Sequence, residues 1–351
     1  MNFQTQLIQW YRLNKRDLPW RQTRNPYFIW LSEIILQQTR VAQGMAYYQR
    51  FVSEFPTVVD LASADEEAVL KLWQGLGYYS RARNLHYTAK QIVALHQGKF
   101  PTTYEEIRSL KGVGDYTAAA ISSFAFNKAH AVVDGNVYRV LSRYFGLENP
   151  IDTSTGKKEY AALANQLLDK KNPGEYNQAI MEFGALQCVP KLVNCAVCCF
   201  TTTCIAAQQN KQNFLPIKAK KTKQRTRYIN YFFIECNEQV LVRQRGAGDI
   251  WQGLYEFPFI ETENFQNENE LLSGKEWQKI FAKSNPIISN VSGLNKHVLT
   301  HQILQVRFWK ISVTELHFKH FLKHYKAVHI EELNHLPWSR LFENYLQNHK
   351  A

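Results

Sequence analysis

The stretch CVPKLVNCAVCCFTTTC, residues 188–204, is the most specific signal in the sequence and the best starting point for inferring the fold. Its cysteines Cys188, Cys195, Cys198 and Cys204 follow the spacing C-x6-C-x2-C-x5-C. Thiolates held this closely need a shared cation, and disulfides are not expected without an export signal. Zinc and an iron-sulfur cluster remain. Because zinc sites more often use two distant C-x2-C pairs, one compact loop of four cysteines favours a 4Fe-4S cluster.

The residues before this loop predict an all-α domain. Two stretches carry the start signal of a helix, a capping box formed by Ser63 with Glu66 and another formed by Thr103 with Glu106. Glycines follow the apolar runs where helices should end, and no βαβ alternation is present. We therefore expect residues 1–207 to form a helical domain that ends in the cysteine loop.

Beyond the loop, the composition and the hydrophobic period change. Residues 208–227, QQNKQNFLPIKAKKTKQRTR, are polar and basic, contain no glycine and predict a linker. The next stretch, RYINYFFIECNEQVLVRQR, contains two β-rich runs joined by the turn pair Asn237 and Glu238. Later runs, LTHQILQVRFWKISV and HYKAVHI, also favour strands. Residues 228–351 are therefore expected to form an α+β domain.

The net charge of +12 is concentrated in two stretches. Residues 1–50 hold seven basic and two acidic residues, residues 201–227 hold seven and none, and the remainder is balanced. Such concentration suits a surface that follows a phosphate backbone, although a solvated basic linker is the alternative. No apolar run approaches the ~18 residues of a membrane helix, and the N-terminus lacks the order of a signal peptide. We expect a monomeric cytoplasmic protein, associated with the nucleoid if it is bacterial, and no membrane partner.

A second motif, LKGVGDYTAAAISSFAF at residues 110–126, places a Gly-Val-Gly turn before an apolar helix. Glycines at Gly112 and Gly114 would let backbone amides at the helix N-terminus approach a phosphate oxygen. A plain turn between two helices is the alternative interpretation of this short pattern.

Two carboxyl groups are candidates for catalysis. Glu33 is the only acid in the apolar stretch PYFIWLSEIILQQTRV, and apolar surroundings raise the pKa of an acid toward that of a general acid. An exposed position on an amphipathic helix is the alternative for this residue. Asp134, in VVDGNVYRVLSR, is placed to cap a helix, which is compatible with a second, catalytic role.

Together these motifs resemble a known family. The cysteine loop and the Gly-Val-Gly turn resemble the iron-sulfur module and the helix-hairpin-helix of the endonuclease III superfamily of DNA glycosylases. The string WLSEIILQQT, after RDLPWR and PY, and the string GLGYYSRARNLH closely resemble the adenine DNA glycosylases of the MutY family. One departure is Lys111, which stands where the hairpin usually has proline.

The resemblance implies a role for each of these residues. Glu33 would protonate adenine at N7 after the base is flipped from the duplex, and Asp134 would stabilise the sugar cation through its charge or a transient covalent bond. Tyr116 and Asn136 would assist these two acids. The DNA-binding residues would be Gln37, Gln38, Tyr78, Lys111, Gly112, Val113 and Gly114, and those lining the adenine pocket Trp20, Arg21, Gln178 and Glu182.

Position 116 separates two kinds of enzyme in this superfamily. The bifunctional relatives carry a lysine there, which attacks the sugar as a Schiff-base nucleophile. Because the phenol of Tyr116 cannot form an imine, the resemblance predicts a monofunctional hydrolase of N-glycosyl bonds that leaves an abasic site.

The C-terminal domain resembles MutT-like Nudix hydrolases at residues 248–258, GDIWQGLYEFP. The sequence that follows lacks the R-E-x-x-E-E order that binds magnesium, so we expect the fold without that chemistry. In adenine glycosylases this domain recognises the 8-oxoguanine opposite the adenine, through a loop that usually reads F-S-H. Leu299, Thr300 and His301 occupy those places here, with a buried strand as the alternative interpretation.

These features predict a DNA repair enzyme that removes adenine opposite 8-oxoguanine, and opposite G, from duplex DNA. A bifunctional pyrimidine-damage glycosylase-lyase is one rival, since it would share the cysteines, the hairpin and Asp134. A non-enzymatic iron-sulfur DNA-binding protein and a Nudix phosphohydrolase are the others.

Overall fold

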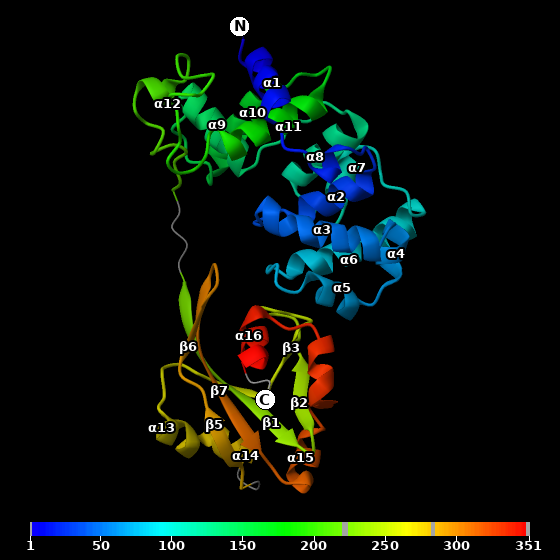
Figure 1. The fold of residues 1–351 in the computed structure, drawn as a ribbon, viewed down its shortest axis with the longest axis vertical. Coiled ribbons are helices and arrows are strands. Elements are labelled where there is room, and N and C mark those ends of the chain that lie inside the picture. Colours follow the sequence, from blue (N-terminus) through cyan, green and yellow to red (C-terminus); the bar gives the residue numbers. More distant parts are fainter. Residues whose placement is uncertain (1, 220–223, 282–284, 349–351) are drawn as a thin grey trace. The chain divides into compact units, whose positions relative to one another are not determined.

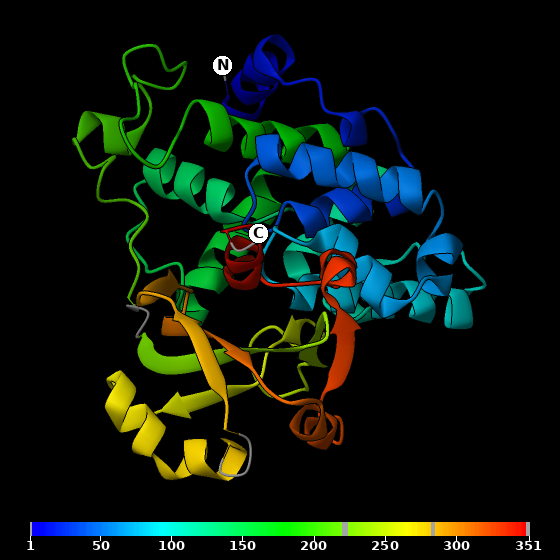
Figure 2. The ribbon, with the colours of Figure 1, turned by 60° about the horizontal axis from the view of Figure 1, so that its bottom comes forward.

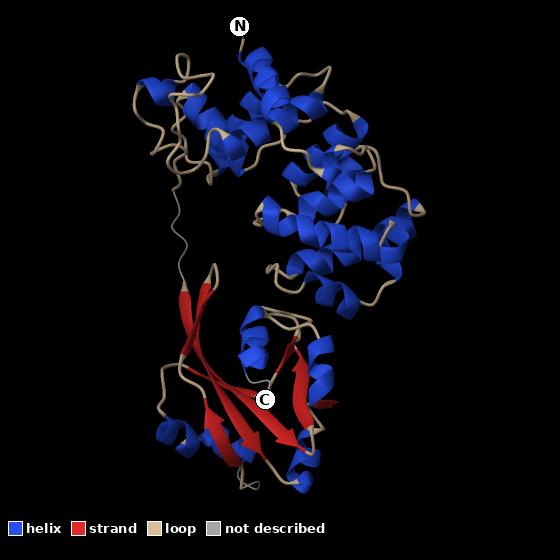
Figure 3. Cartoon of the chain, in the orientation of Figure 1, coloured by secondary structure: helices blue, strands red, loops and turns tan. Residues whose placement is uncertain are grey.

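In the computed structural model, which describes residues 2–219, 224–281 and 285–348, the chain forms two compact units. One unit consists of Met1–Ser63 with Asn84–Lys221, and the other of Ala64–Arg83 with Thr222–Ala351. Figure 3 shows that helices build the first unit and that the strands belong to the second. The predicted combination of an all-α part and an α+β part is confirmed.

The first unit is assembled from short helices joined by tight turns. Helices α1, α9 and α11 pack on one another around a core that includes Leu7, Leu141 and Phe183 (Figures 1 and 2). Helix α6 crosses the boundary between the two units. The helices of this unit are α1 (Phe3–Asn14), η1 (Pro19–Arg21), α2 (Pro26–Ile35), α3 (Val41–Glu54), α4 (Val58–Ser63), α6 (Ser80–His96), α7 (Tyr104–Ser109), α8 (Asp115–Phe126), α9 (Gly135–Phe145), α10 (Ser154–Leu167), α11 (Pro173–Leu186) and α12 (Ile205–Gln208).

Only one of the two predicted capping boxes forms. The hydroxyl of Thr103 accepts a hydrogen bond from the Glu106 amide, and the Glu106 carboxylate accepts one from the Thr103 amide. The prediction for Ser63 is wrong, because Ser63 is the last residue of α4 and its backbone is still helical. An N-cap residue needs an extended backbone, and Asp65 supplies it before α5 (Glu66–Trp73).

The second unit is built on a mixed sheet. Its longest strands, β1 and β7, run parallel, and the other pairs are antiparallel. The predicted turn is present, since Asn237 and Glu238 join β1 to β2 with left-handed backbones. The strands are β1 (Arg225–Cys236), β2 (Gln239–Gln244), β3 (Tyr255–Glu256), β4 (Phe259–Thr262), β5 (Ile287–Val291), β6 (Asn295–Val298), β7 (Gln302–Ser312) and β8 (Lys326–His329).

Helices cover both faces of this sheet. Tyr231 of β1 points into one core, where it packs with Phe308 and with Phe342 of α16 (Arg340–Asn348). The next residue, Phe232, points into the opposite core and contacts Trp277. This alternation follows from the two-residue repeat of a strand. The remaining helices of this unit are α13 (Glu268–Ser273), α14 (Lys275–Phe281), α15 (Glu315–Phe321) and η2 (Ile330–His335).

The basic segment 208–227 is structured at both of its described ends. Leu215 is only 3% exposed, and its carbonyl accepts a hydrogen bond from Arg143. At the other end β1 begins at Arg225, inside the stretch predicted as linker. Residues 220–223 lie outside the described residues. Among the described helices, none is both long and apolar enough to cross a membrane.

Replacing Thr103 with alanine should lower the free energy of unfolding by about 1 kcal/mol, because the capping box is lost from α7. Ser63→Ala is the matched control, expected to change it by less than about 0.5 kcal/mol because Ser63 caps no helix. Chemical denaturation followed by circular dichroism measures both. Equal losses in the two variants would contradict this assignment of the helix starts.

Candidate active site

One cavity in the first unit, of about 700 Å³, collects the predicted catalytic residues and those of the predicted adenine pocket. It lies among side chains from α2, α8, α9 and α11 and from the 3-10 helix η1. The predicted residues that line it are Trp20, Arg21, Glu33, Gln37, Gln38, Tyr116, Asp134, Asn136, Gln178 and Glu182.

Glu33 lies on the face of α2 that enters this cavity and is 7% exposed. The pKa of Glu33 is raised to about 7, chiefly by burial and to a smaller extent by the negative charge of Asp134. The hydroxyl of Tyr116 donates a 2.7 Å hydrogen bond to Oε2 of Glu33, which acts in the opposite direction. The predicted buried acid is thus observed, and the exposed alternative does not apply.

Asp134 is the N-cap of α9 and lines the cavity at the same time. Its Oδ1 accepts hydrogen bonds from the amides of Asn136 and Val137, at 2.9 and 2.8 Å, and its Oδ2 accepts from the Asn136 side chain at 2.7 Å. Burial raises the pKa of Asp134, while these three donors favour the ionised form. Capping and access to the cavity are therefore compatible, as the sequence predicts.

Arg139 extends this network away from the cavity. Its guanidinium donates to Oδ1 of Asn136 at 2.9 Å and to the carbonyl of Cys188 at 2.6 Å. It also donates to the carbonyls of Gly135 and Gly184. One buried side chain thus joins the partner of Asp134 to the first residue of the cysteine loop.

The pKa of a third carboxyl group in the cavity, that of Glu182, is shifted in the opposite direction. Glu182 is 1% exposed and accepts paired hydrogen bonds from both Arg16 and Arg21. Burial opposes ionisation, but these hydrogen bonds lower the pKa of Glu182 to about 2. Nearby, Tyr11 donates its hydroxyl to Oε1 of Gln178 at 2.7 Å. The cavity wall therefore carries a cluster in which one carboxylate pairs with two guanidinium groups.

The predicted DNA-stack residues follow α2 directly. Gln37 donates to the hydroxyl of Thr117 at 3.3 Å, whereas Gln38 is exposed and adopts a left-handed backbone. Trp20 is buried, with its ring 5.0 Å from that of Tyr48.

The Gly-Val-Gly turn connects α7 to α8, as expected of a helical hairpin. Gly112 has φ +76°, and a Cβ there would lie 2.8 Å from Asn84, so no other residue fits without strain. Gly114 is the N-cap of α8 and faces open space. Val113 is buried, and Lys111 is exposed beside the turn. None of these four residues lines the cavity.

The four cysteines of the loop line one small cavity of their own, together with apolar residues such as Val140 and Phe183. Within the described part of the chain, no three Cys, His, Asp or Glu side chains converge tightly enough to hold a single metal ion. Arg143 donates to Sγ of Cys188 at 3.4 Å and to the carbonyl of Val189 at 2.8 Å.

The predicted recognition residues lie in the second unit, in the loop between β6 and β7. Thr300 and His301 are exposed, while Leu299 packs partly against the core beside α16. The hydroxyl of Tyr78, in the Ala64–Arg83 segment of the same unit, lies 2.7 Å from that of Thr300.

Sequence reasoning missed three arginines that shape these sites, namely Arg16, Arg139 and Arg143. Arg16 stands in the quoted string RDLPWR, and Arg139 follows Asn136 by three residues, one turn along α9. The signal that could have identified Arg139 was a basic residue one helical turn after Asn136. Two of the partners of Arg139, however, are the carbonyls of Gly184 and Cys188, which only packing brings close.

Glu182→Gln should lower the free energy of unfolding near neutral pH by about 3 kcal/mol, because two arginines lose their buried counter-charge. A carboxylate with a lowered pKa stabilises the fold above its unfolded value of 4.5 and loses that effect as the pH falls toward about 2. The difference between wild type and variant should therefore shrink below pH 4.5. Glu175→Gln, on the same helix but in an exposed pair with Arg12, should cost less than about 1 kcal/mol. A cost for Glu182→Gln that does not vary with pH would contradict the assignment.

Comparison with known proteins identifies the families of both parts of the chain. The model of the HhH-GPD superfamily base excision DNA repair proteins matches residues 31–166, and the NUDIX domain model matches residues 230–348. The structure of a thermostable thymine-DNA glycosylase is similar, with a TM-score of 0.55 and 29% identity over 59% of this chain and 95% of that one. An endonuclease III–DNA complex, 21% identical with a TM-score of 0.51, shares the fold over 60% of this chain.

Sequence relatives cover more of the chain. The adenine DNA glycosylase of Buchnera aphidicola subsp. Baizongia pistaciae is 34% identical over 311 residues, which is 87% of this chain and 84% of that protein. The human adenine DNA glycosylase is 43% identical over 222 residues, 61% of this chain and 41% of the human protein. The chain therefore belongs to the adenine DNA glycosylase family of base excision repair enzymes, with a helix-hairpin-helix domain followed by a Nudix domain.

Proposed function

We propose that this enzyme hydrolyses the N-glycosyl bond of adenine paired with 8-oxoguanine, or with G, in duplex DNA. The observation that carries the proposal is the convergence of Glu33 and Asp134 on one cavity, where the charge of one acid raises the pKa of the other. Cleavage of a glycosidic bond requires two carboxyl groups, one that donates a proton and one that stabilises the sugar cation. The cavity lies within the helical unit, so an adenine must leave the base stack to reach it.

Glu33 acts as the general acid. Because its pKa is raised to about 7, a substantial fraction is protonated at neutral pH. The hydroxyl of Tyr116 donates to Oε2, which leaves Oε1 to carry the proton. That proton passes to N7 of adenine as the C1′–N9 bond breaks and its electron pair stays with the base.

Asp134 stabilises the positive charge that develops on the sugar. Its two oxygens accept hydrogen bonds from Asn136 and Val137, which favour its ionised form against the effect of burial and fix its direction. Water then adds to C1′ and loses a proton to the Glu33 carboxylate, which restores the acid. The product is an abasic site, and no strand cleavage follows because Tyr116 cannot form a Schiff base.

The proposal assigns DNA-binding roles to several parts of the chain. The hairpin with Lys111, Gly112, Val113 and Gly114 offers helix N-terminal amides to a phosphate, and Lys111 adds a charge. Gln37, Gln38 and Tyr78 contact the base stack. Trp20, Arg21, Gln178 and Glu182 line the pocket for the flipped adenine, and Leu299, Thr300 and His301 recognise 8-oxoguanine.

A 4Fe-4S cluster would be held by Cys188, Cys195, Cys198 and Cys204, whose side chains surround one apolar cavity. When bound, it would cross-link the loop that follows α11 and so restrict the motion of the chain beside α9 and α11. Arg143 donates to Sγ of Cys188 and would stabilise the thiolate that a cluster needs.

Glu33→Gln should bind the mispaired duplex with nearly unchanged affinity but release adenine at least about a hundredfold more slowly, since no acid remains to protonate the base. Duplexes with A:8-oxoguanine, A:G and A:T are incubated with enzyme and cleaved by alkali at abasic sites. Glu54→Gln, at an exposed position, is the control and should match the wild type. Substantial adenine release by Glu33→Gln, or a product trapped by borohydride, would defeat the proposal in favour of other chemistry.

The rate of adenine release should be nearly level below pH 7 and fall about tenfold per pH unit above it, because Glu33 acts in its protonated form and its pKa is about 7. Single-turnover rates on one duplex between pH 6 and pH 9 measure this profile. A rate that rises with pH across that range would show that the ionised form of the group is the active one.

A further inference from the structure

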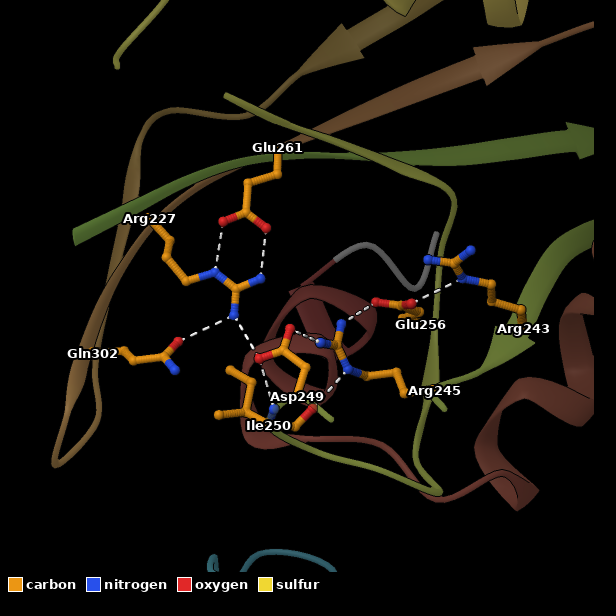
Figure 4. Close-up of polar contacts among 8 residues, drawn as sticks. All are labelled: Arg227, Arg243, Arg245, Asp249, Ile250, Glu256, Glu261 and Gln302. Carbon is orange, nitrogen blue, oxygen red and sulfur yellow. Dashed lines mark hydrogen bonds and ion pairs between the residues drawn. The ribbon is translucent and has the colours of Figure 1, made fainter. Parts of the chain in front are cut away.

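A network of partly buried ion pairs joins four strands and a loop of the second unit (Figure 4). Arg227 of β1 pairs with Glu261 of β4 through two hydrogen bonds, of 2.7 and 2.5 Å. Arg245, directly after β2, donates to Asp249 at 2.7 Å and also pairs with Glu256 of β3. Arg227 and Arg245 both have side chains only 6% exposed.

Asp249 lies in the loop that connects β2 to β3 and binds two arginines. One oxygen accepts from Arg227 at 2.8 Å and the other from Arg245 at 2.7 Å. Arg245 also donates to the carbonyl of Ile250 at 2.8 Å, and its own carbonyl accepts from the Gly253 amide. Burial alone would raise the pKa of Asp249, but the hydrogen bond from Arg227 and the two positive charges lower it. These ion pairs and hydrogen bonds therefore restrain the loop between β2 and β3.

Arg227 also reaches the loop between β6 and β7, which carries the predicted recognition residues. Its Nη1 donates to Oε1 of Gln302 at 3.1 Å, and the same nitrogen donates to Asp249. Gln302 is the first residue of β7 and follows His301 directly, and its carbonyl accepts from the Leu299 amide at 2.8 Å. The Arg227 guanidinium thus contacts the loop between β2 and β3 through Asp249. Through Gln302 it also contacts the base of the four-residue recognition loop, residues 299–302.

We propose that Arg227 is a positioning residue for recognition of the base opposite adenine, because it holds residues 299–302 in the orientation that reads 8-oxoguanine. The inference rests on the proposed function. Thr300 and His301 are exposed and must be ordered before they can discriminate between two purines. A planar guanidinium with three fixed partners orders them in advance, so less entropy is lost when DNA binds.

Arg227→Met in the whole, cluster-loaded chain removes the charge and every donor but keeps an unbranched apolar stem. In a Glu33→Gln background, which cannot turn over, affinities for A:8-oxoguanine and A:G duplexes are measured at one salt concentration. The preference for 8-oxoguanine should fall about fivefold, the range expected when one or two side chains must be ordered on binding. Affinity for A:G should stay nearly unchanged.

Arg243→Met is the matched control, because Arg243 pairs with Glu256 at 2.9 Å at the other end of the network. It should keep the preference, so an equal loss in this variant would mean that general stability is responsible and would overturn the inference. Gln302→Leu leaves the carboxylate pairs of Arg227 intact and should also lower the preference. This variant decides the matter if circular dichroism shows that Arg227→Met does not fold.

The outcomes also separate this inference from the proposed function. If the chain with Arg227 intact shows no preference for 8-oxoguanine over G, the proposed function fails at its recognition step. If that chain shows the preference and both Arg227→Met and Gln302→Leu retain it, the positioning role of Arg227 is wrong and the proposed function stands.

Discussion

The active site depends on keeping one carboxyl group out of water. Glu33 lies on a helix whose neighbours are Trp30, Leu31, Ile34 and Ile35, all buried in the helical core. Removal of water penalises the charged form, and the nearby charge of Asp134 adds to that penalty. Without this apolar enclosure the carboxyl group would be ionised at neutral pH and could not donate a proton. The hydrophobic packing of α2 therefore sets the chemistry as well as the fold.

The same cavity shows how differently burial can act on two acids. Burial raises the pKa of Glu33, whose neighbours are one neutral hydroxyl and one like charge, whereas two guanidinium groups lower the pKa of Glu182 in spite of its burial. Both are almost fully enclosed, so the partners rather than the degree of burial decide the outcome. Burial also raises the pKa of Asp134, and three hydrogen bonds offset part of that rise. Acids in different protonation states can thus share one site.

Charged side chains also organise the second unit, although it has no Nudix magnesium motif. The β-strand pattern places Arg227 and Glu261 on adjacent strands, and their pairing lies at the edge of an aromatic core that includes Tyr231 and Phe342. Buried ion pairs are weak evidence for stability, because desolvation offsets much of their attraction. Such pairs instead restrict conformation, since a guanidinium with three partners permits few alternative arrangements of the loops attached to it.

The sequence by itself determined the features that depend on neighbours along the chain. The cysteine spacing, the apolar stretch around Glu33, the N-cap at Asp134, the capping box at Thr103 and the turn at Asn237 and Glu238 are all set by local period and residue type. The capping prediction at Ser63 failed because two helices meet there, and a local pattern does not show where the first one ends.

Only the tertiary structure decided which distant groups meet. Tyr116 bonds to Glu33 across 83 positions, and Arg16 and Arg21 reach Glu182 across more than 160. Arg139 joins Asn136 to the carbonyl of Cys188, and Arg227 joins Asp249 to Gln302. Long charged side chains have many possible partners in a sequence, and the choice among them is made by the packing of helices and strands, which removes water from some pairs and leaves the others in solvent.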